Sequence, residues 1–191
     1  MPVVLLIRLL YTKSMSELAT LGGGCYWCLE AIYQRVLGVE RVTSGYSGGH
    51  VDNPDIYQVY AGKTGHAECV QVEFDPGVIT YREILEIFYV MHNPTTLNQQ
   101  DYDIGEIYRS VIFYHSEKQQ KIATEMTEGF AADLWPDPIV TELVKFEKFW
   151  PAGPEAQDFY NRNPYSGYCH FIIDPKIQKL RQKFTSKLKT A

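Results

Sequence analysis

Residues 18–37 read LATLGGGCYWCLEAIYQRVL, and this stretch decides the fold. Residues 18–21 form a strand candidate that three glycines end, because glycine lets the backbone turn sharply. From Cys25 to Leu37, apolar side chains recur at helical spacing, and Gly38 provides the stop. The stretch therefore predicts a strand, a tight glycine turn and a helix that begins at Cys25.

The chain on the C-terminal side extends this unit into a β-α-β-β-α-β pattern. Residues 39–46 are rich in β-branched side chains, and residues 68–74 alternate as a strand does. A capping box at Thr80 and Glu83 opens a second helix, and residues 110–114 predict a fourth strand. Two helices on one face of an antiparallel sheet give this order. We therefore predict an α+β fold, a two-layer α/β sandwich with a ferredoxin-like (split βαβ) core.

The last third of the chain has a different character. Residues 139–144 are the last strand candidate, and Asp174 opens a helix with one apolar stripe. Six of the ten prolines lie between Pro136 and Pro175. Such a segment predicts an irregular C-terminal wrap over the core rather than a second domain. The length also favours one domain, which we place at residues 15–191.

Residues 1–14 form an N-terminal extension that we exclude from this domain. Residues 2–10 are apolar, but Arg8 interrupts them and they fall short of the ~20 residues of a membrane helix. A basic start and an Ala-x-Ala cleavage site, which mark a signal peptide, are absent. The extension predicts an edge strand, a disordered arm, or a non-native start before Met15. This pattern predicts a cytoplasmic protein that is not bound to a membrane.

Composition narrows the class of partner. Lys and Arg number 18 and Asp and Glu number 23, which gives a formal net charge of −5. This balance argues against nucleic acid and anionic membranes as partners. Four cysteines are too few for a disulfide scaffold at this length. Each thiol therefore needs its own explanation.

Cys25 is the strongest candidate for a reactive thiol. At the start of a helix, free N–H groups and the helix dipole stabilise a thiolate, which is the nucleophilic form of cysteine. Cys28 lies three residues further on, where a disulfide with Cys25 is possible. A metal site is not expected, because there is no second C-x-x-C pair and the histidines are scattered.

Two further features adjoin this thiol in the pattern. Tyr26 and Trp27 predict an apolar wall for a small substrate group such as a methyl. Glu68 shares its strand face with apolar residues, and burial among them raises the pKa of a carboxyl group. Cys69 points to the opposite strand face and is interpreted as structural.

Several motifs of the chain resemble those of the A-type peptide methionine sulfoxide reductases, which act on the S epimer of the sulfoxide. The resemblance extends from about residue 21 to residue 173. The motifs stand in family order and spacing: GCYWC at 24–28, GYSGG at 45–49, TGHAE at 64–68, DIG at 103–105, YRS at 108–110 and NPYSGYC at 163–169. The family has a two-layer α/β sandwich with a ferredoxin-like core, in agreement with the predicted strand order.

The resemblance implies roles for individual residues. Cys25 is the nucleophile that attacks the sulfoxide sulfur, and Glu68 protonates the oxygen. Tyr108 helps to bind that oxygen, and Asp103 lines the site. Tyr26, where the family usually has Phe, forms the methyl pocket with Trp27. No metal or other cofactor is implied, and the electrons come from thioredoxin or from dithiothreitol.

The chain departs from the family pattern in two places. A second oxygen-binding tyrosine usually stands where this chain has Ile56, and we assign that role to Tyr57, one residue later. The family's Glu-x-x-His-Gln motif is altered at residues 153–157, which read GPEAQ. This change puts in doubt the hydrogen bonds that normally hold the C-terminal segment.

The resemblance also implies a recycling step. A sulfenic acid on Cys25 condenses with a second thiol to a disulfide. Cys169 and Cys28 are the two candidates, and we place Cys169 first. Residues from about 150 to 191 then form a recycling segment. The expected partners are oxidised proteins, free methionine-S-sulfoxide and thioredoxin, and the expected state is a monomer.

Two other functions remain open at this point. Cys25-x-x-Cys28 also suits a thioredoxin-like disulfide oxidoreductase, which needs neither Glu68 nor Cys169. A non-catalytic peptide-binding module using the aromatic glycine-tyrosine loops would tolerate loss of Cys25. Activity toward methionine-S-sulfoxide with dithiothreitol separates these readings.

Overall fold

The sheet at the centre of the molecule is built as the predicted element order requires. A computed structural model describes residues 15–190, so the expected extension at 1–14 lies outside the described residues. Within this range, six strands form one sheet in the order β7-β6-β1-β3-β2-β8. The strands are β1 (Glu17–Gly22), β2 (Val39–Ser47), β3 (Ala67–Phe74), β6 (Val111–Tyr114), β7 (Glu142–Lys145) and β8 (Phe149–Pro151).

The four predicted strands lie together in the sheet. β6, β1, β3 and β2 are antiparallel neighbours. No end of these strands differs from its predicted position by more than one residue. The sheet as a whole is mixed, because β7 pairs in parallel with β6. The sequence predicted β7 a few residues too early, at 139–144, and missed β8, which pairs with β2.

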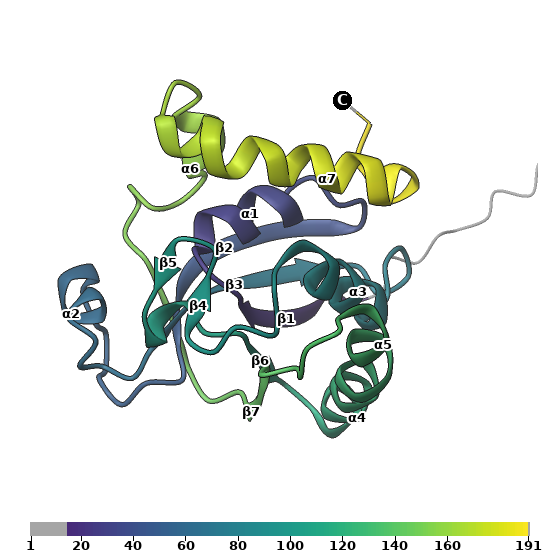
Figure 1. Ribbon diagram of the computed structural model, residues 1–191, viewed down its shortest axis with the longest axis horizontal. Helices are drawn as coiled ribbons and strands as arrows, with labels where there is room; N and C mark the ends of the chain where they lie inside the picture. Colours follow the sequence, from purple (N-terminus) through teal and green to yellow (C-terminus); the bar gives the residue numbers. More distant parts are fainter. Residues whose placement is uncertain (1–14, 191) are drawn as a thin grey trace, which may run out of the picture.

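Helices cover the sheet and one another. α1 contacts β2 and β3, α3 contacts β1, and α7 packs on both helices. Figure 1 shows α7 running beside α1 along one side of the molecule. The helices are α1 (Tyr26–Tyr33), α2 (Ile56–Tyr60), α3 (Tyr81–Met91), α4 (Glu117–Glu125), α5 (Ala132–Leu134), α6 (Phe159–Arg162) and α7 (Asp174–Phe184).

Helix α1 is shorter than its sequence predicts. It ends at Tyr33, although the apolar pattern continues to Leu37. The backbone N–H of Leu37 donates to the Lys187 carbonyl at 2.8 Å, and the Lys189 N–H donates to the Arg35 carbonyl at 2.9 Å. Contacts with the C-terminal chain thus replace the hydrogen bonds of a further helical turn, which periodicity in a single segment does not reveal.

The C-terminal segment is more regular than its prolines predict. It supplies β8, α6, a π-helical turn at Cys169–Ile173 and α7. Gln157 holds it to the sheet: its side chain accepts from Ser44 N and donates to the carbonyls of Ser44 and Ala152, each at 2.9 Å. Gln157, the one residue of the altered 153–157 motif that the chain retains, therefore still ties the C-terminal segment to the sheet.

A buried carboxylate anchors the same segment from the other side. Glu30 on α1 is 1% exposed and accepts from the backbone N–H groups of Asp158 at 2.8 Å and Phe159 at 3.3 Å. Asp158 has φ 53°, a left-handed conformation in which the turn presents both N–H groups to one carboxylate. Glu30 and Gln157 together fix the path of the chain that carries Cys169.

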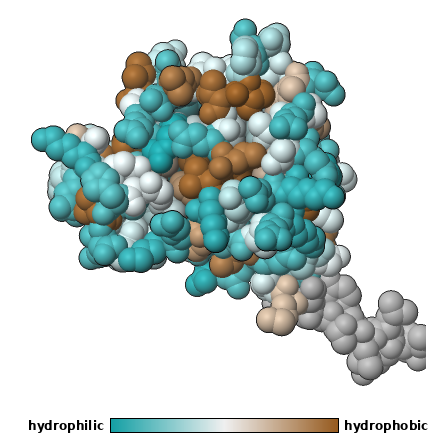
Figure 2. All heavy atoms as spheres, turned by 90° about the horizontal axis from the view of Figure 1, so that it is seen from below, coloured by the Kyte–Doolittle hydropathy of each residue, from teal (hydrophilic) through white to brown (hydrophobic). Residues whose placement is uncertain are grey.

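The surface is mixed in polarity. Figure 2 shows apolar side chains gathered in separate patches among hydrophilic ones on the face that it presents. Among residues 15–190, no helix is both long and apolar enough to cross a membrane. A small hairpin, β4 (Gln99–Gln100) and β5 (Asp103–Ile104), stands apart from the main sheet and carries Asp103.

Candidate active site

The glycine turn places Cys25 where the sequence predicted it, as the residue that caps the N-terminus of α1. Gly24 has φ +85°, and a Cβ there would lie 2.5 Å from Cγ of Gln100, so both conformation and space require glycine. The Gly24 N–H donates to the Tyr108 carbonyl at 3.1 Å, which ties the turn to the loop of a second site residue. Cys25 itself is 7% exposed.

Glu68 lies in the core beside this turn. It is 1% exposed on β3, and one carboxylate oxygen accepts from the backbone N–H of Tyr26 at 3.0 Å. Burial raises the pKa of Glu68 to about 8, although hydrogen bonds from Tyr26 N–H and the Tyr60 hydroxyl oppose the shift. Glu68 therefore holds a proton at neutral pH, as its apolar strand face predicted.

The pKa of Cys25 is shifted in the direction opposite to the predicted one. We expected the helix N-terminus to favour its thiolate, but burial, a hydrogen bond to Cys28 and the charge of Glu68 raise its pKa. Cys28 is shifted the other way: the hydrogen bond from Cys25 lowers its pKa, and Lys176 adds to this effect against burial. In the reduced protein at rest, the negative charge of this coupled pair favours the Cys28 sulfur.

Tyrosine hydroxyls surround the carboxyl group of Glu68. Burial, followed by the charge of Glu68, raises the pKa of Tyr108 and of Tyr60, so both are neutral donors at neutral pH. The hydroxyls of Tyr26 and Tyr46 lie 3.4 Å apart, which gives the extra hydroxyl of Tyr26 a partner.

Tyr57 does not lie with this group. Its side chain is 82% exposed, whereas Tyr60, at the other end of α2, reaches the Glu68 carboxyl. A capping box between Asp55 and Gln58 starts α2 just before Ile56. Tyr57 lies in solvent, whereas the half-exposed Tyr60 directs its hydroxyl to the Glu68 carboxyl group. The structure therefore brings Tyr60, rather than the predicted Tyr57, to the site.

An aromatic wall borders the thiols. Trp27 stacks on Phe159 with ring centroids 3.7 Å apart and meets the edge of Tyr168 at 5.8 Å. Tyr26 contacts Trp27 at 5.8 Å on the other side. The sequence predicted Tyr26 and Trp27, but Phe159 was missed because it is more than 130 residues away along the chain and carries no local signal.

Cys28 interacts with Tyr168 and Cys169 of the C-terminal segment. Its sulfur lies 3.8 Å from the Tyr168 hydroxyl, which donates to Asp103 at 3.3 Å. The charge of Cys28 also acts on Cys169, which is 1% exposed in the next turn. Cys28 thus interacts with both Cys25 and Cys169. All four thiols of the chain, Cys69 included, are free.

Cys69 stands apart from this group. It lies with Ala67, Val111 and Phe113 in a separate buried cluster on the other side of the sheet, as strand alternation predicted. Within residues 15–190, no three His, Cys, Asp or Glu side chains are grouped so that they could hold a metal ion.

The fold and the site define a thiol-dependent oxidoreductase, in which a buried cysteine at a helix N-terminus faces a protonated carboxylic acid. Residues 17–188 match the family model described as peptide methionine sulfoxide reductase. The chain belongs to the peptide methionine sulfoxide reductase MsrA family, and it is a peptide-methionine (S)-S-oxide reductase.

Curated relatives cover nearly the whole chain. The peptide methionine sulfoxide reductase MsrA of Sulfolobus acidocaldarius is 53% identical over 171 residues, which are 90% of this chain and 97% of the relative. The enzyme of the same name from Saccharolobus solfataricus is 51% identical over 173 residues, covering 91% and 97%.

Solved structures agree with the fold. Mxr1 of Saccharomyces cerevisiae in reduced form superposes with a TM-score of 0.74 at 31% identity, covering 81% of this chain and 90% of that one. Methionine sulfoxide reductase A of Corynebacterium diphtheriae gives a TM-score of 0.72 at 28% identity, covering 80% and 77%.

Proposed function

We propose that this enzyme reduces methionine-S-sulfoxide, free and in oxidised proteins, by attack of Cys25 on the sulfoxide sulfur while Glu68 protonates the oxygen. One observation carries the proposal: a carboxylic acid that keeps its proton to about pH 8 lies beside a buried thiol at a helix N-terminus. A sulfoxide oxygen leaves its sulfur readily only when it is protonated, so this acid supplies what the reaction needs.

The proton of the attacking thiol has an acceptor in the site. The hydrogen bond between Cys25 and Cys28 lowers the pKa of Cys28 and raises that of Cys25, so Cys28 is the better proton acceptor of the pair. As Cys25 attacks, its proton passes to Cys28 and the proton of Glu68 passes to the oxygen. The Cys25 sulfur bonds to the substrate sulfur, the substrate S–O bond then breaks as the hydroxyl moves to Cys25, and a sulfenic acid forms while methionine leaves with its sulfur reduced.

Two hydroxyls are aimed at the region where the oxygen gains charge. Tyr108 and Tyr60 both lie close enough to Glu68 for their titration to be affected by its charge, and Tyr60 bonds its carboxyl group. Neutral donors placed around a developing negative charge stabilise the transition state as an oxyanion hole does. Asp103, on the β4-β5 hairpin, borders the same space through Tyr168.

The substrate methyl group has a matching surface. Trp27 is held by stacking on Phe159, and Tyr26 lies beside it with its hydroxyl engaged by Tyr46. Trp27 is only partly buried and therefore offers an apolar surface to the methyl group, and the fully buried Tyr26 supports it from behind. Burial of a methyl group against such faces contributes about 0.8 kcal/mol per group to binding.

The positions of the thiols favour a relay. Cys28 is hydrogen-bonded to Cys25, whereas Cys169 interacts with Cys28 only electrostatically. We therefore infer that Cys28 forms the first disulfide with Cys25. Cys169 then attacks Cys28 and forms a Cys28–Cys169 disulfide, which frees Cys25. The sequence had placed Cys169 first. Thioredoxin is the proposed final reductant, since a yeast Mxr1 structure with a TM-score of 0.52 and 26% identity contains Trx2.

The test is a single-turnover experiment with excess enzyme and N-acetyl-methionine-S-sulfoxide. Wild type and Cys28→Ser should each release one methionine per enzyme, and Cys25→Ser should release none. Thiol titration after the turnover should show two thiols lost in wild type and in Cys169→Ser, but no disulfide with Cys25 in Cys28→Ser.

Other outcomes would decide against the proposal. Methionine release by Cys25→Ser would remove the assigned nucleophile. A Cys25–Cys169 disulfide in wild type before any Cys25–Cys28 disulfide would contradict the relay. Reduction of a disulfide substrate by wild type, without any release of methionine from the sulfoxide, would favour a thioredoxin-like enzyme instead.

A further inference from the structure

Arg109, the residue after Tyr108, carries a cation that is buried in the fold, with its side chain only 8% exposed. Each guanidinium nitrogen donates to a different acceptor: Nε to Glu142 Oε2 at 3.2 Å, Nη1 to the Glu106 carbonyl at 3.0 Å and Nη2 to the Gly65 carbonyl at 3.1 Å. The Glu142 carboxylate compensates the charge. A lysine ammonium has a single nitrogen and cannot reach three separated acceptors in this way.

The two carbonyl partners of Arg109 belong to segments that carry proposed site residues. Glu106–Tyr108 form one 3-10 turn, and the bond to the Glu106 carbonyl lies within this turn. Gly65 precedes β3, on which Glu68 is the second residue. The guanidinium therefore joins the turn that carries Tyr108 to the start of the strand that carries Glu68.

The end of β2 packs closely on the same guanidinium. Gly48 has φ +83°, and a Cβ on it would lie 3.2 Å from Nη2 of Arg109 and 2.8 Å from ring carbons of Phe113. The left-handed conformation and the close approach both favour glycine at this position. The glycines of the GYSGG segment thus leave Arg109 a closely fitted place beside the sheet.

The turn of Tyr108 also supports the turn of the nucleophile. The Gly24 N–H, one residue before Cys25, donates to the Tyr108 carbonyl at 3.1 Å. A displacement of the Tyr108 turn would therefore be felt at the Gly24 amide, which gives this turn a marker that is independent of the tyrosine hydroxyl.

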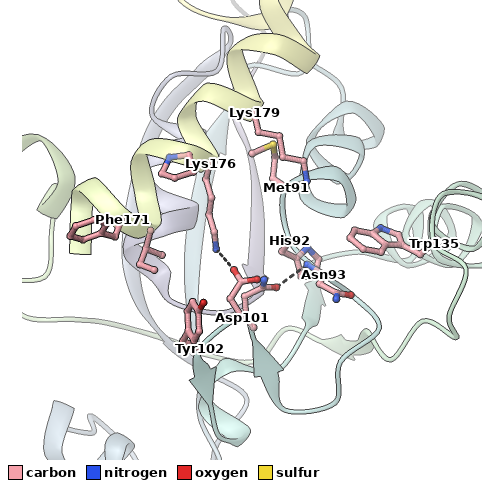
Figure 3. A pocket seen from close by; sticks show the side chains of 12 residues that line it. Met91, His92, Asn93, Asp101, Tyr102, Trp135, Phe171, Lys176 and Lys179 are labelled. Atoms are coloured by element: carbon pink, nitrogen blue, oxygen red, sulfur yellow. Dashed lines mark hydrogen bonds and ion pairs between the residues drawn. The ribbon is translucent and has the colours of Figure 1, made fainter. Parts of the chain in front are cut away.

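A different contact holds the chain on the other side of this turn. The Gly105 N–H donates to the Asn98 carbonyl at 2.9 Å, which ties the turn to the β4-β5 hairpin. Figure 3 shows the hairpin facing α7 across a cavity of about 640 Å³, where Lys176 forms an ion pair with Asp101 at 3.1 Å. These contacts lead toward α7, whereas the bond from Arg109 leads to the chain before β3.

The loop that carries Tyr60 is closed by a different side chain. Nδ1 of His66 accepts from the Gly49 N–H at 3.0 Å, so the proton of the neutral ring lies on Nε2, which donates to the Val51 carbonyl at 2.8 Å. These bonds are independent of Arg109. A change at Arg109 should therefore affect Tyr60 much less than the turn to which Arg109 itself belongs.

We propose that Arg109 is a positioning residue of the reduction step, which holds the turn of Tyr108 against the start of β3 so that the tyrosine hydroxyl is aimed at the oxygen that Glu68 protonates. The inference rests on the proposed function. Arg109 acts through Tyr108 and takes no part in bond making or breaking. A donor displaced by about 1 Å can cost roughly 10²-fold in rate.

The experiment measures the rate of the first turnover of N-acetyl-methionine-S-sulfoxide, over a series of concentrations, in wild type and Arg109→Lys. The maximal rate should fall roughly 10- to 100-fold. The half-saturating concentration should stay within about twofold of the wild-type value, because the methyl pocket is unchanged. Arg41→Lys is the matched control and should keep the wild-type rate, since Arg41 is 72% exposed and bonds the Glu73 side chain. An unchanged maximal rate in Arg109→Lys would overturn the proposal.

A double-mutant cycle shows whether Arg109 acts through Tyr108. In a Tyr108→Phe background, Arg109→Lys should slow the first turnover by no more than about twofold further, because the hydroxyl that it positions is gone. In a Tyr60→Phe background, its full effect should persist. Equal effects in the two backgrounds would assign Arg109 to the fold alone and overturn the proposal, as would failure of both Arg109→Lys and Arg109→Gln to fold, judged by circular dichroism.

Amide hydrogen exchange tests the same link without catalysis. In Arg109→Lys, the Gly24 N–H should exchange roughly tenfold faster than in wild type. The Leu37 N–H, which donates to the Lys187 carbonyl at 2.8 Å, should keep its rate. This result supports the placement of the turn by Arg109 even if wild type released no methionine, which would refute only the proposed function. Unchanged exchange at Gly24, or equal acceleration at both amides, would refute the role of Arg109.

Discussion

Two buried glutamates, Glu68 in the site and Glu30 beneath the C-terminal segment, show that similar burial can serve different purposes. Glu68 lies under the sulfoxide side of the site and Glu30 under the C-terminal segment, and each is 1% exposed. Glu30 accepts two backbone N–H groups, from Asp158 and Phe159, which oppose the effect of burial on its pKa. Glu68 accepts one backbone N–H, and its pKa rises to about 8.

The comparison indicates what separates an acid from an anchor. Burial disfavours the charged carboxylate in both places, but each N–H donor offsets part of that cost. Glu30 has donors enough to serve as a fixed acceptor for a turn of chain. Glu68 has fewer donors, so the cost is relieved by a proton, and that proton is what the proposed reaction uses.

The largest expected effect is the loss of that proton. Glu68→Gln keeps the shape of the side chain but removes the acid, so kcat should fall by roughly 10²–10⁴-fold. The free energy of unfolding at pH 7 should not fall, because Glu68 must take up a proton on folding at this pH, whereas the amide is neutral in both states. Steady-state methionine release and urea unfolding measure the two quantities. Activity near the wild-type value would remove Glu68 from the acid role.

The second effect is on stability as a function of pH. The folded-state pKa of Glu68 is about 8 and its ordinary value is 4.5, so the unfolded chain releases this proton first. Stability from Glu68 is then fully present below about pH 4.5 and is lost as pH rises through about 8, by up to about 5 kcal/mol. Urea midpoints across this window should fall in wild type and vary less in Glu68→Gln. Parallel curves for the two proteins would contradict the raised pKa.

A smaller effect should distinguish the two tyrosines of α2. Tyr60→Phe removes the hydroxyl that bonds Glu68, and kcat should fall roughly 10- to 100-fold. Tyr57→Phe is the matched control, since Tyr57 is 82% exposed on the same helix. Its activity should equal that of the wild type. If Tyr57→Phe were the impaired variant, the placement of Tyr60 beside Glu68 would be wrong.

The smallest effect belongs to the anchor. Glu30→Gln turns one acceptor oxygen into an amide that cannot accept from Asp158 and Phe159 together, and the free energy of unfolding should fall by about 1–3 kcal/mol. The first-turnover release of methionine should stay close to that of the wild type, because the hydrogen bonds of Glu30 go to Asp158 and Phe159 and not to Cys25 or Glu68. Urea unfolding and single-turnover assays check this. A chemical defect as large as that of Glu68→Gln would abolish the distinction between the two glutamates.

The residues around the nucleophile were predictable because their signals are local. A glycine turn before an apolar helix gives the place of Cys25, and strand alternation gives the burial of Glu68 and the separate face of Cys69. Tyr60 was missed because family spacing pointed to the start of α2, whereas the direction of a side chain depends on where the helix begins. The capping box at Asp55 sets that start.

The C-terminal half was predicted less well, for a different reason. Phe159 stacks on Trp27, more than 130 residues away along the chain, and nothing in its neighbourhood of the sequence marks it, whereas Gln157 belongs to the altered motif at 153–157. The charge of the Cys25–Cys28 pair also depends on burial and on Lys176. The helix N-terminus alone predicted the opposite direction for Cys25.

The sequence by itself determined the family, the β-α-β-β-α-β order and the pairing of a helix-capping cysteine with a buried glutamate, because spacing and periodicity act over a few residues. Only the tertiary structure decided which thiol of the pair has the lower pKa, which tyrosine reaches Glu68, and how the chain that carries Cys169 is held. These properties depend on desolvation and on hydrogen bonds between distant segments, and both arise only when the chain is folded.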